Sequence, residues 1–396
     1  MIDNSIISRV NRVGSFIIAI LLIMSSITGF FHLPQWVYYG TMGVILLVVV
    51  ASHGIRLKQP SIVLFIFICA LSLLINQPPA YFNAWTRLLG FIMLLCAVSP
   101  LFNNHKISLF RYSIFDSIMT LLVYLSIGSL ICYFLGINFF VRNGELLEIE
   151  VGHFSGLFNH SMVMGPASAL ASIYLLVKFL GRKKKKTLYL VSILACLACT
   201  LLSASRVAVG GCILGMIVAY MRFYSGHLSK GLLVLLVLVA LLAVTFPVWG
   251  GLTDFVIGKQ EANMSMGGTF ASRESLFAAR IQEIIEHPLI GVGFCCVDPR
   301  FGGVDMSRGG VEPGSSWLAI FSMTGIFGLL TFMSLYYKKI REAFRISATD
   351  SSSLFVGCMA FFLFHLLFEG YILAVGNFMG LFFWLLLGSL STYTKN

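Results

Sequence analysis

Long apolar runs separated by short polar segments make up most of the chain. Each run is continuous and roughly 15–22 residues long, the length of a helix that crosses a membrane. A transmembrane β-barrel would instead alternate apolar and polar positions. Twelve runs lie at residues 14–31, 37–51, 61–75, 85–102, 114–136, 161–180, 187–202, 207–221, 231–249, 315–337, 353–373 and 376–392. This pattern predicts an all-α polytopic membrane protein with about twelve transmembrane helices, in which residues 1–396 form a single membrane domain.

The composition supports this interpretation. Of the 396 residues, 58% are hydrophobic and only 11% are charged, whereas soluble domains have roughly 45–50% apolar and about 25% charged residues. A globular core could not bury so much apolar surface. The net charge of +11 then has a simple origin, because basic residues accumulate in the cytoplasmic loops of membrane proteins. It does not indicate nucleic-acid binding.

The charged residues also orient the chain. If the basic segment 181–186 (GRKKKK) is cytoplasmic, alternating crossings place most Lys and Arg residues inside and most Asp and Glu residues outside. Both termini are then cytoplasmic. Two long loops lie outside, at residues 137–160 and 250–314. We therefore expect a multi-pass protein of the cytoplasmic membrane with two extracytoplasmic loops.

The larger outer loop contains a predicted amphipathic helix. Residues 272–287 (SRESLFAARIQEIIEH) carry an apolar stripe at helical spacing, and Pro288 follows as a helix stop. Such a helix is suited to lie on the outer membrane–water boundary.

Two arginines of this predicted helix are candidates for function. Arg273 and Arg280 are seven residues apart and so share one face. They could pair with Glu274 and Glu283 on a solvated charged face. Alternatively they could converge as an anion site, because the guanidinium fork matches the oxygens of a diphosphate.

Arg206 is a third candidate. It lies in LLSASRVAVGG, at a tight outer turn between two apolar runs. An arginine here could simply extend to the interface. The small residues 203–205 before it would also let a ligand or another backbone approach closely. Ionisable groups beside membrane spans are costly, and this cost favours a function.

Two carboxylates are candidates for chemistry. Glu312 precedes the run that begins at Ser315, and a carboxylate there could act as a general base toward a sugar hydroxyl. It could equally be an ordinary loop residue. Glu369 lies near the outer end of its predicted span, where it needs a partner, and an arginine from another helix would serve.

Three further residues are expected at the outer face. Asn159 and His160 lie in FSGLFNHS, and a histidine there can titrate near neutrality, although a lone histidine is more often structural. Arg87 begins the run AWTRLLGF. It is either an interface anchor or a phosphate contact.

Signals of several other chemistries are missing from the sequence. GVGF at residues 291–294 lacks the Lys of a nucleotide-binding loop, so nothing indicates nucleotide-driven transport. No Asp-x-Asp pair indicates a metal-dependent nucleotide-sugar enzyme, and the nine cysteines show no metal-ligand pattern. A carrier-activated sugar donor, with no metal or other cofactor, fits these features better.

Several of these stretches, in order, resemble the O-antigen ligase and polymerase superfamily. SRESLFAARIQEIIEHPLIGVGF is similar to the family's arginine-led helix followed by His-Pro-Leu and Gly-x-Gly-Phe. LLSASRVAVGG resembles its Ser-Arg turn, and SSWLAIFSMTGIFGLL resembles its span with a Thr-Gly-Ile-x-Gly core. HLLFEGYILAVGNFMGLFFWLLLG resembles the ending of its polysaccharide polymerases.

The resemblance implies a GT-C-like, metal-independent inverting glycosyltransferase. It would transfer a glycan from undecaprenyl diphosphate to a hydroxyl acceptor at the outer face of a bacterial cytoplasmic membrane. Membrane lipid and chain-length regulator proteins are the further partners it suggests. Matched by motif, Arg206 and either Arg273 or Arg280 would hold the diphosphate.

One departure separates two branches of the family. Ligases that load glycan onto lipid A–core resemble one another in a His-Asn pair, where this chain reads EPGSSW at residues 312–317. This version looks more like the polymerase branch, with Glu312 in the place of the base and Ser315, Ser316 and Trp317 near the substrate. A polymerase of lipid-linked repeat units is therefore favoured over an O-antigen ligase.

Two alternatives of other classes stay open. A flippase or transporter of lipid-linked sugar would usually carry internal repeats and polar sites near the bilayer midplane. Here the candidate charges cluster at the predicted outer face instead. A non-enzymatic assembly scaffold is the remaining possibility.

Overall fold

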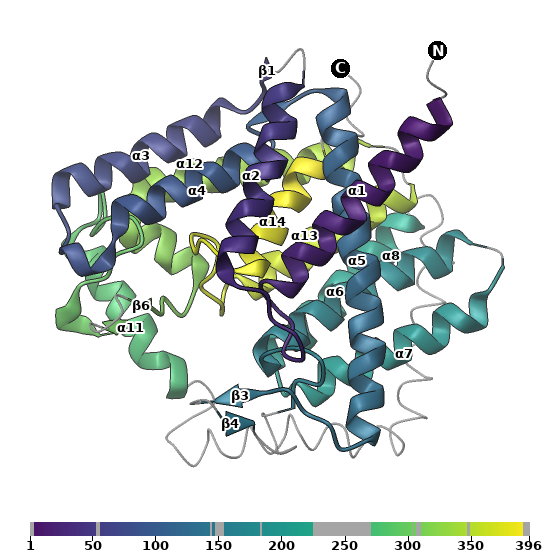
Figure 1. Cartoon of the computed structure of the whole chain (residues 1–396). Coiled ribbons are helices and arrows are strands. Elements are labelled where there is room, and N and C mark those ends of the chain that lie inside the picture. Colours follow the sequence, from purple (N-terminus) through teal and green to yellow (C-terminus); the bar gives the residue numbers. More distant parts are fainter. Residues whose placement is uncertain are drawn as a thin grey trace.

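The computed structural model describes residues 4–52, 56–142, 145–146, 154–182, 184–224, 271–302, 304–305, 310–346 and 349–390. This part of the chain is a bundle of helices with three two-residue strand pairs (Figure 1). The helices are α1 (Asn4–Met24), α2 (Gln35–Ala51), α3 (Pro60–Asn76), α4 (Ala84–Val98), α5 (His105–Phe134), α6 (Ser161–Gly181), α7 (Lys186–Leu202), α8 (Arg206–Phe223), α11 (Ala271–Glu286), α12 (Ser316–Arg345), α13 (Asp350–His365) and α14 (Phe378–Leu390). Two short 3-10 helices span Ala80–Phe82 and Pro299–Phe301.

The predicted helices agree with this architecture. Eleven of the predicted apolar runs overlap α1–α8 and α12–α14, and the predicted loop helix is α11. The run at 231–249 and the loop residues 250–270 lie outside the described residues. Among the described residues, five helices are long and apolar enough to cross a membrane, and six shorter apolar helices accompany them. The chain is therefore a polytopic α-helical membrane protein, and its twelve crossings stay a prediction.

α14 forms the centre of the bundle. Every one of its side chains is buried, and it packs against α4, α5, α12 and α13. α8 and α13 cross closely because glycines face each other, and a Cβ on Gly357 would lie 2.8 Å from the carbonyl oxygen of Gly215. Small residues allow such contacts between membrane helices. Large apolar side chains such as Leu47, Phe67 and Leu188 are exposed on the outer surface of the bundle, as expected of a lipid-facing surface.

The predicted extracytoplasmic segments lie at one end of the bundle (Figure 1). α1 begins at the end where β1 (Arg56–Leu57) pairs with β2 (Phe102–Asn103). At the opposite end, β3 (Val141–Arg142) pairs with β4 (Glu145–Leu146), and α11 lies at the same end. β5 (Val304–Asp305) pairs with β6 (Gly310–Val311) in the loop after α11. The predicted functional loops therefore share one end of the molecule.

The glycine-rich signature after α11 inserts into a break in α12. Gly325 leaves the helical conformation (φ +67°, ψ −172°), and a Cβ there would lie 2.0 Å from the carbonyl oxygen of Leu289. Val292 and Gly293 donate backbone hydrogen bonds to the carbonyls that the break exposes, those of Ser322 and Met323. The Gly-x-Gly-Phe motif at residues 291–294 thus contacts the Thr-Gly-Ile-x-Gly core of α12. This contact anchors α11 to α12.

The predicted span 353–373 is wrong at its outer end. α13 stops at His365, and residues 366–377 form turns rather than helix. Ser316 N donates to the carbonyls of Leu366 and Glu369, so this irregular backbone is satisfied by α12. Non-helical backbone at membrane depth is tolerated only where protein buries it or where it lines a cavity. Apolarity alone could not distinguish this buried segment from helix.

Candidate active site

Arg273 and Glu369 meet at the end of the bundle that carries the loops. Arg273 lies in the first turn of α11, and Glu369 lies in the segment after α13. Arg273 Nη2 is 2.5 Å from Glu369 Oε1, and Arg273 Nη1 donates to the carbonyl oxygens of Gly314 (3.0 Å) and Phe368. The two side chains are 17% and 19% exposed. The prediction that an arginine would partner Glu369 is confirmed.

Arg206 approaches this ion pair from another helix, α8. It is the first residue of α8, and Ser205 caps that helix by accepting a hydrogen bond from Ala208 N (3.4 Å). Arg206 lies close enough to Arg273 for the two charges to repel each other. Two neighbouring guanidinium groups beside a helix N-terminus favour an anion.

The small residues before Arg206 bring two helices together. A Cβ on Gly165 of α6 would lie 2.5 Å from Ser203 Oγ and 3.0 Å from the Cβ of Ser205. Ala204 between them has a positive φ of 51°, which makes the turn tight. The close approach of another backbone that the sequence allowed at these small residues is therefore observed, at Gly165 of α6.

Arg280 has different surroundings from Arg273. Arg280 Nη2 lies 3.0 Å from Glu283 Oε1, and both side chains are 0% exposed. Glu283 also accepts a hydrogen bond from Asp298 N (2.7 Å). Burial lowers the pKa of Arg280, and burial raises the pKa of Glu283 to about 7 although the charge of Arg280 opposes this. The two arginines are therefore held by separate carboxylates rather than converging on one group.

Ser315 and Ser316 hold the segment that carries Glu369. Ser316 Oγ donates to the Glu369 carbonyl (2.6 Å) and accepts from Tyr371 N (3.1 Å). Both serines are buried, and Ser315 caps α12. Trp317 packs against aromatic rings of the bundle. Of these three residues, which were expected near the substrate, the two serines hold the segment that carries Glu369, and Trp317 packs within the bundle.

A cavity of about 700 Å³ adjoins this ion pair; we call it the polar cavity. The loop after α1, the start of α6, Glu312 and the segment after α13 form its walls. Its polar lining consists of Ser26, Thr28, His32, Asn159, His160, Glu312, His365, Glu369, Tyr371 and Asn377. The fold thus brings together four of the predicted residues, Asn159, His160, Glu312 and Glu369.

Asn159 and His160 are held at the polar cavity by local hydrogen bonds. His160 Nδ1 accepts from Met162 N (3.0 Å), and Asn159 Nδ2 donates to the Ser26 carbonyl (3.1 Å). Because Nδ1 accepts, the neutral His160 ring carries its proton on Nε2 and can donate from there.

His365 and Tyr371 complete the polar lining, and the sequence reasoning did not single them out. His365 Nδ1 lies 2.9 Å from Tyr371 Oη, and both residues are buried. His365 Nε2 is buried without a hydrogen-bond partner among the described residues. The ring lies close enough to Arg273 to sense its charge. The signal that could have identified His365 is an ionisable residue inside an apolar run.

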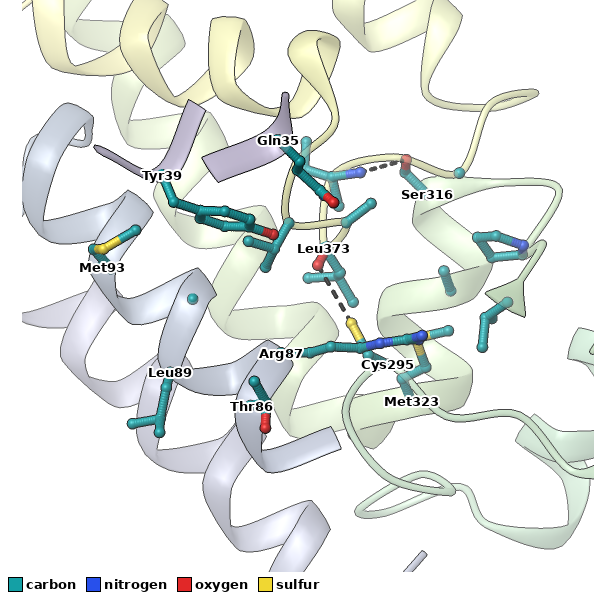
Figure 2. A pocket seen from close by; sticks show the side chains of 18 residues that line it. Gln35, Tyr39, Thr86, Arg87, Leu89, Met93, Cys295, Ser316, Met323 and Leu373 are labelled. Carbon is teal, nitrogen blue, oxygen red and sulfur yellow. Dashed lines mark hydrogen bonds between the residues drawn. The ribbon is translucent and has the colours of Figure 1, made fainter. Parts of the chain in front are cut away.

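Arg87 lines a second cavity, of about 820 Å³, which we call the Arg87 cavity. The starts of α2, α4 and α12 and residues 370–375 bound it. Figure 2 shows Arg87 lying across it toward Cys295 and Met323. The lining is mainly apolar and includes Leu89, Met93, Ala319, Ile372, Leu373 and Val375.

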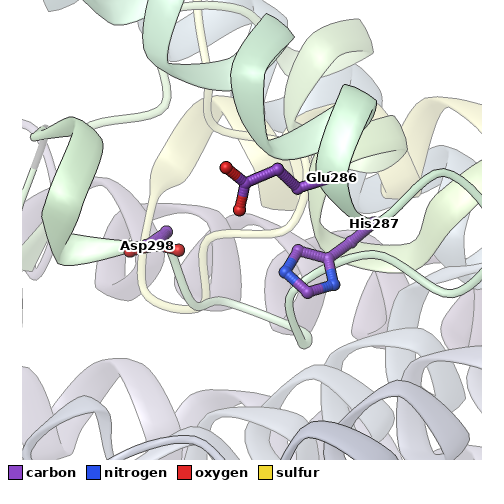
Figure 3. Close-up of side chains that lie close together, drawn as sticks. All are labelled: Glu286, His287 and Asp298. Atoms are coloured by element: carbon purple, nitrogen blue, oxygen red, sulfur yellow. The ribbon is translucent and has the colours of Figure 1, made fainter.

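Glu286, His287 and Asp298 lie together near the end of α11 in a grouping that could hold a metal ion (Figure 3). However, Arg300 Nη2 lies 2.5 Å from a carboxylate oxygen of both Glu286 and Asp298. The hydrogen bonds from Arg300 lower the pKa of Asp298. An ion-pair network therefore already accounts for this cluster, and we assign it no metal.

Residues 190–333 match the family model described as O-Antigen ligase. The matched region begins in α7, includes Arg206, Arg273 and Glu312, and ends in α12. A comparison with curated protein sequences finds no match. The match confirms the family resemblance drawn from the motifs, and members of that family are glycosyltransferase-like enzymes.

Proposed function

We propose that this chain, which matches the O-Antigen ligase family model over residues 190–333, polymerises undecaprenyl-diphosphate-linked oligosaccharide repeat units. The reaction takes place at the outer face of a bacterial cytoplasmic membrane. One observation carries the proposal: the Arg273–Glu369 ion pair, with Arg206 beside it, adjoins the cavity that holds Glu312 and His160. A candidate anion site thus lies next to a candidate general base.

The donor is the growing chain on its carrier, and the acceptor is a hydroxyl of the next repeat unit. The acceptor oxygen attacks the anomeric carbon from the side opposite the diphosphate. The bond from that carbon to the diphosphate oxygen breaks, and its electron pair leaves with undecaprenyl diphosphate. The hydroxyl proton passes to the Glu312 carboxylate. The new glycosidic bond therefore has inverted configuration.

Arg206 and Arg273 stabilise the diphosphate as it departs. Their guanidinium groups offer several N–H donors to phosphate oxygens, and such preorganised charge is a large source of rate enhancement. They supply the positive charge that a metal ion supplies in other glycosyltransferases. Arg273 suits this role better than Arg280, because Arg280 is 0% exposed and already bound to Glu283.

Glu312 suits the role of base better than His160. Glu312 is exposed at the polar cavity, and an ionised carboxylate accepts a proton directly. His160 uses Nδ1 to accept from Met162 N, so its Nε2–H is placed to donate to a sugar oxygen.

An O-antigen ligase would use the same chemistry with lipid A–core as the acceptor. The Glu312 segment, in place of a His-Asn pair, favours the polymerase. A flippase is favoured less, because Arg206, Arg273 and Glu312 gather at one end of the bundle rather than at its middle. In the proposed topology both termini are cytoplasmic, and chain-length regulator proteins are candidate partners.

The experiment that tests the proposal is a gene deletion complemented with wild-type or Glu312→Gln protein. The surface glycan and the lipid-linked pool are then analysed by gel. We expect the deletion strain to show core carrying a single repeat, without a ladder. We expect Glu312→Gln to reproduce it, because losing a general base costs roughly 10²–10⁴ in rate.

Two other results would each contradict the proposal. Bare core with long chains still on the carrier would identify a ligase. Single repeats held on the cytoplasmic leaflet would identify a flippase and end the catalytic interpretation. A full ladder with Glu312→Gln would move the role of base to His160.

A further inference from the structure

The Arg87 cavity has the chemistry of a site for an anionic amphiphile. Arg87 and the polar residues Gln35, Tyr39 and Thr86 lie among mainly apolar side chains. In Figure 2, Gln35 and Tyr39 face the cavity from the side opposite Cys295. A phosphate group and a hydrocarbon chain could therefore be bound together, by Arg87 and by the apolar walls respectively.

Two of the helices that line the cavity, α2 and α4, each carry an exposed tryptophan at their start. Trp36 and Trp85, at the starts of α2 and α4, are 73% and 48% exposed, and exposed tryptophans mark the membrane–water boundary. Leu89 lines the cavity and is 67% exposed. A lipid chain lying against this exposed side of α4 could therefore reach the cavity without leaving the bilayer.

A single thin wall separates the Arg87 cavity from the polar cavity. Val311 and Pro313 line the Arg87 cavity, whereas Glu312 between them lines the polar cavity. The segment after α13 is shared in the same way, since Gly370 lines the first cavity and Tyr371 the second. A ligand headgroup in the Arg87 cavity is therefore adjacent to the proposed base.

We infer that the Arg87 cavity binds the polyprenyl diphosphate of a second lipid-linked glycan, the acceptor of the polymerisation. This inference rests on the proposed function, in which the acceptor keeps its own carrier while Arg206 and Arg273 hold the carrier of the donor. The isoprenoid chain lies against Leu89 and Met93, and Arg87 binds the diphosphate. The attached glycan passes over Glu312 into the polar cavity.

The test counts bound undecaprenyl diphosphate on the full-length protein by native mass spectrometry in detergent. Wild-type protein is expected to bind two equivalents, and Arg87→Gln and Arg273→Ala are each expected to retain one. We expect the affinity of the lost site to fall about 10- to 100-fold, the effect of losing charge-assisted hydrogen bonds. Ala374→Trp, which narrows the Arg87 cavity without removing charge, should also retain one equivalent.

Different results overturn different claims. Two equivalents retained by both Arg87→Gln and Ala374→Trp would overturn the inference and leave the proposed function intact. The inference would also be overturned if wild-type protein bound a single equivalent and Arg273→Ala abolished that binding. If wild-type protein bound a single equivalent and only Arg87→Gln abolished that binding, the Arg87 site would stand and the proposed role of Arg273 would be overturned. Displacement of one equivalent by an equal concentration of phosphatidylglycerol would identify a general anionic-lipid site and overturn the assignment to the carrier.

Discussion

The two ends of α11 carry the same pair of chemical groups in opposite surroundings. At its start, Arg273 binds Glu369, which comes from a segment distant in sequence, and both side chains are about one-fifth exposed, at 17% and 19%. Near its other end, Arg280 binds Glu283 of the same helix, and both are 0% exposed. Only the first pair adjoins the polar cavity.

This difference shows how burial decides what an ion pair can do. A fully buried pair has lost its water, so breaking it leaves a charge uncompensated in a low-dielectric environment. A partly exposed pair can release one partner to an incoming anion at much smaller cost, because water screens the charges. We therefore interpret Arg273 as a ligand for the diphosphate and Arg280 as an anchor that fixes α11 to the loop after it.

The largest expected effect is on the buried pair. At about pH 8, where Glu283 with its pKa of about 7 is ionised, Arg280→Ala should lower the free energy of unfolding by about 3–5 kcal/mol, the cost of removing one partner of a buried ion pair. The polymerisation rate per folded molecule should stay unchanged. Denaturant titration of the purified protein in mixed micelles measures the first quantity, and chain assembly on lipid-linked repeats measures the second.

The matched control replaces both partners. Arg280→Met with Glu283→Leu should recover most of the lost stability, because an apolar pair of similar volume often equals a buried ion pair. A stable but inactive Arg280→Ala protein would break the comparison, since Arg280 would then be a second ligand for the diphosphate.

The next effect is on the exposed pair, and it should appear in rate rather than stability. Arg273→Ala should slow polymerisation by about 10²–10³, by analogy with the loss of one oxyanion donor. Unfolding should be affected less than by Arg280→Ala, because the Arg273–Glu369 pair is partly hydrated whereas the Arg280–Glu283 pair is 0% exposed. Single-turnover assays with a defined lipid-linked donor would measure the chemical step.

Two conservative variants sharpen this result. Arg273→Lys keeps the charge but loses the guanidinium fork, so it should recover part of the rate. Glu369→Gln keeps the size of the side chain but weakens its hold on Arg273, so it should reduce the rate less than Arg273→Ala. Full polymer length and yield with Arg273→Ala would exclude it from the proposed diphosphate site.

Much of the fold could be predicted from the sequence, because membrane helices follow from continuous apolar runs. The same reasoning failed at residues 366–377, where an apolar run leaves the helix after His365. Hydrogen bonds from Ser316, in a distant helix, make that conformation possible. An apolar run predicts burial, but it does not predict which backbone groups form hydrogen bonds with distant parts of the fold.

The site was predictable to the extent that isolated charges are costly in a membrane. Because of that cost, the charged residues Arg206, Arg273, Glu312 and Glu369 could be singled out as candidates. For the same reason, Glu369 was expected to have a partner. That cost could not separate Arg273 from Arg280, because helical periodicity places them on one face while tertiary contacts give them different partners. Sequence spacing therefore locates candidate residues but does not determine their exposure.

The smallest expected effect concerns the proton on Glu283. Burial raises the pKa of Glu283 to about 7 from an ordinary value of 4.5, so its stabilising contribution is complete below about pH 4.5 and is lost as the pH rises through about 7. Protection of the α11 amides from hydrogen exchange, corrected for the chemical rate, should fall across this window by less than about tenfold per pH unit, the limit for one proton. Glu283→Gln should give a flat profile. Protection that instead rises with pH would mean that Arg280 holds the pKa of Glu283 below its ordinary value, and the buried pair would then behave electrostatically like the exposed one.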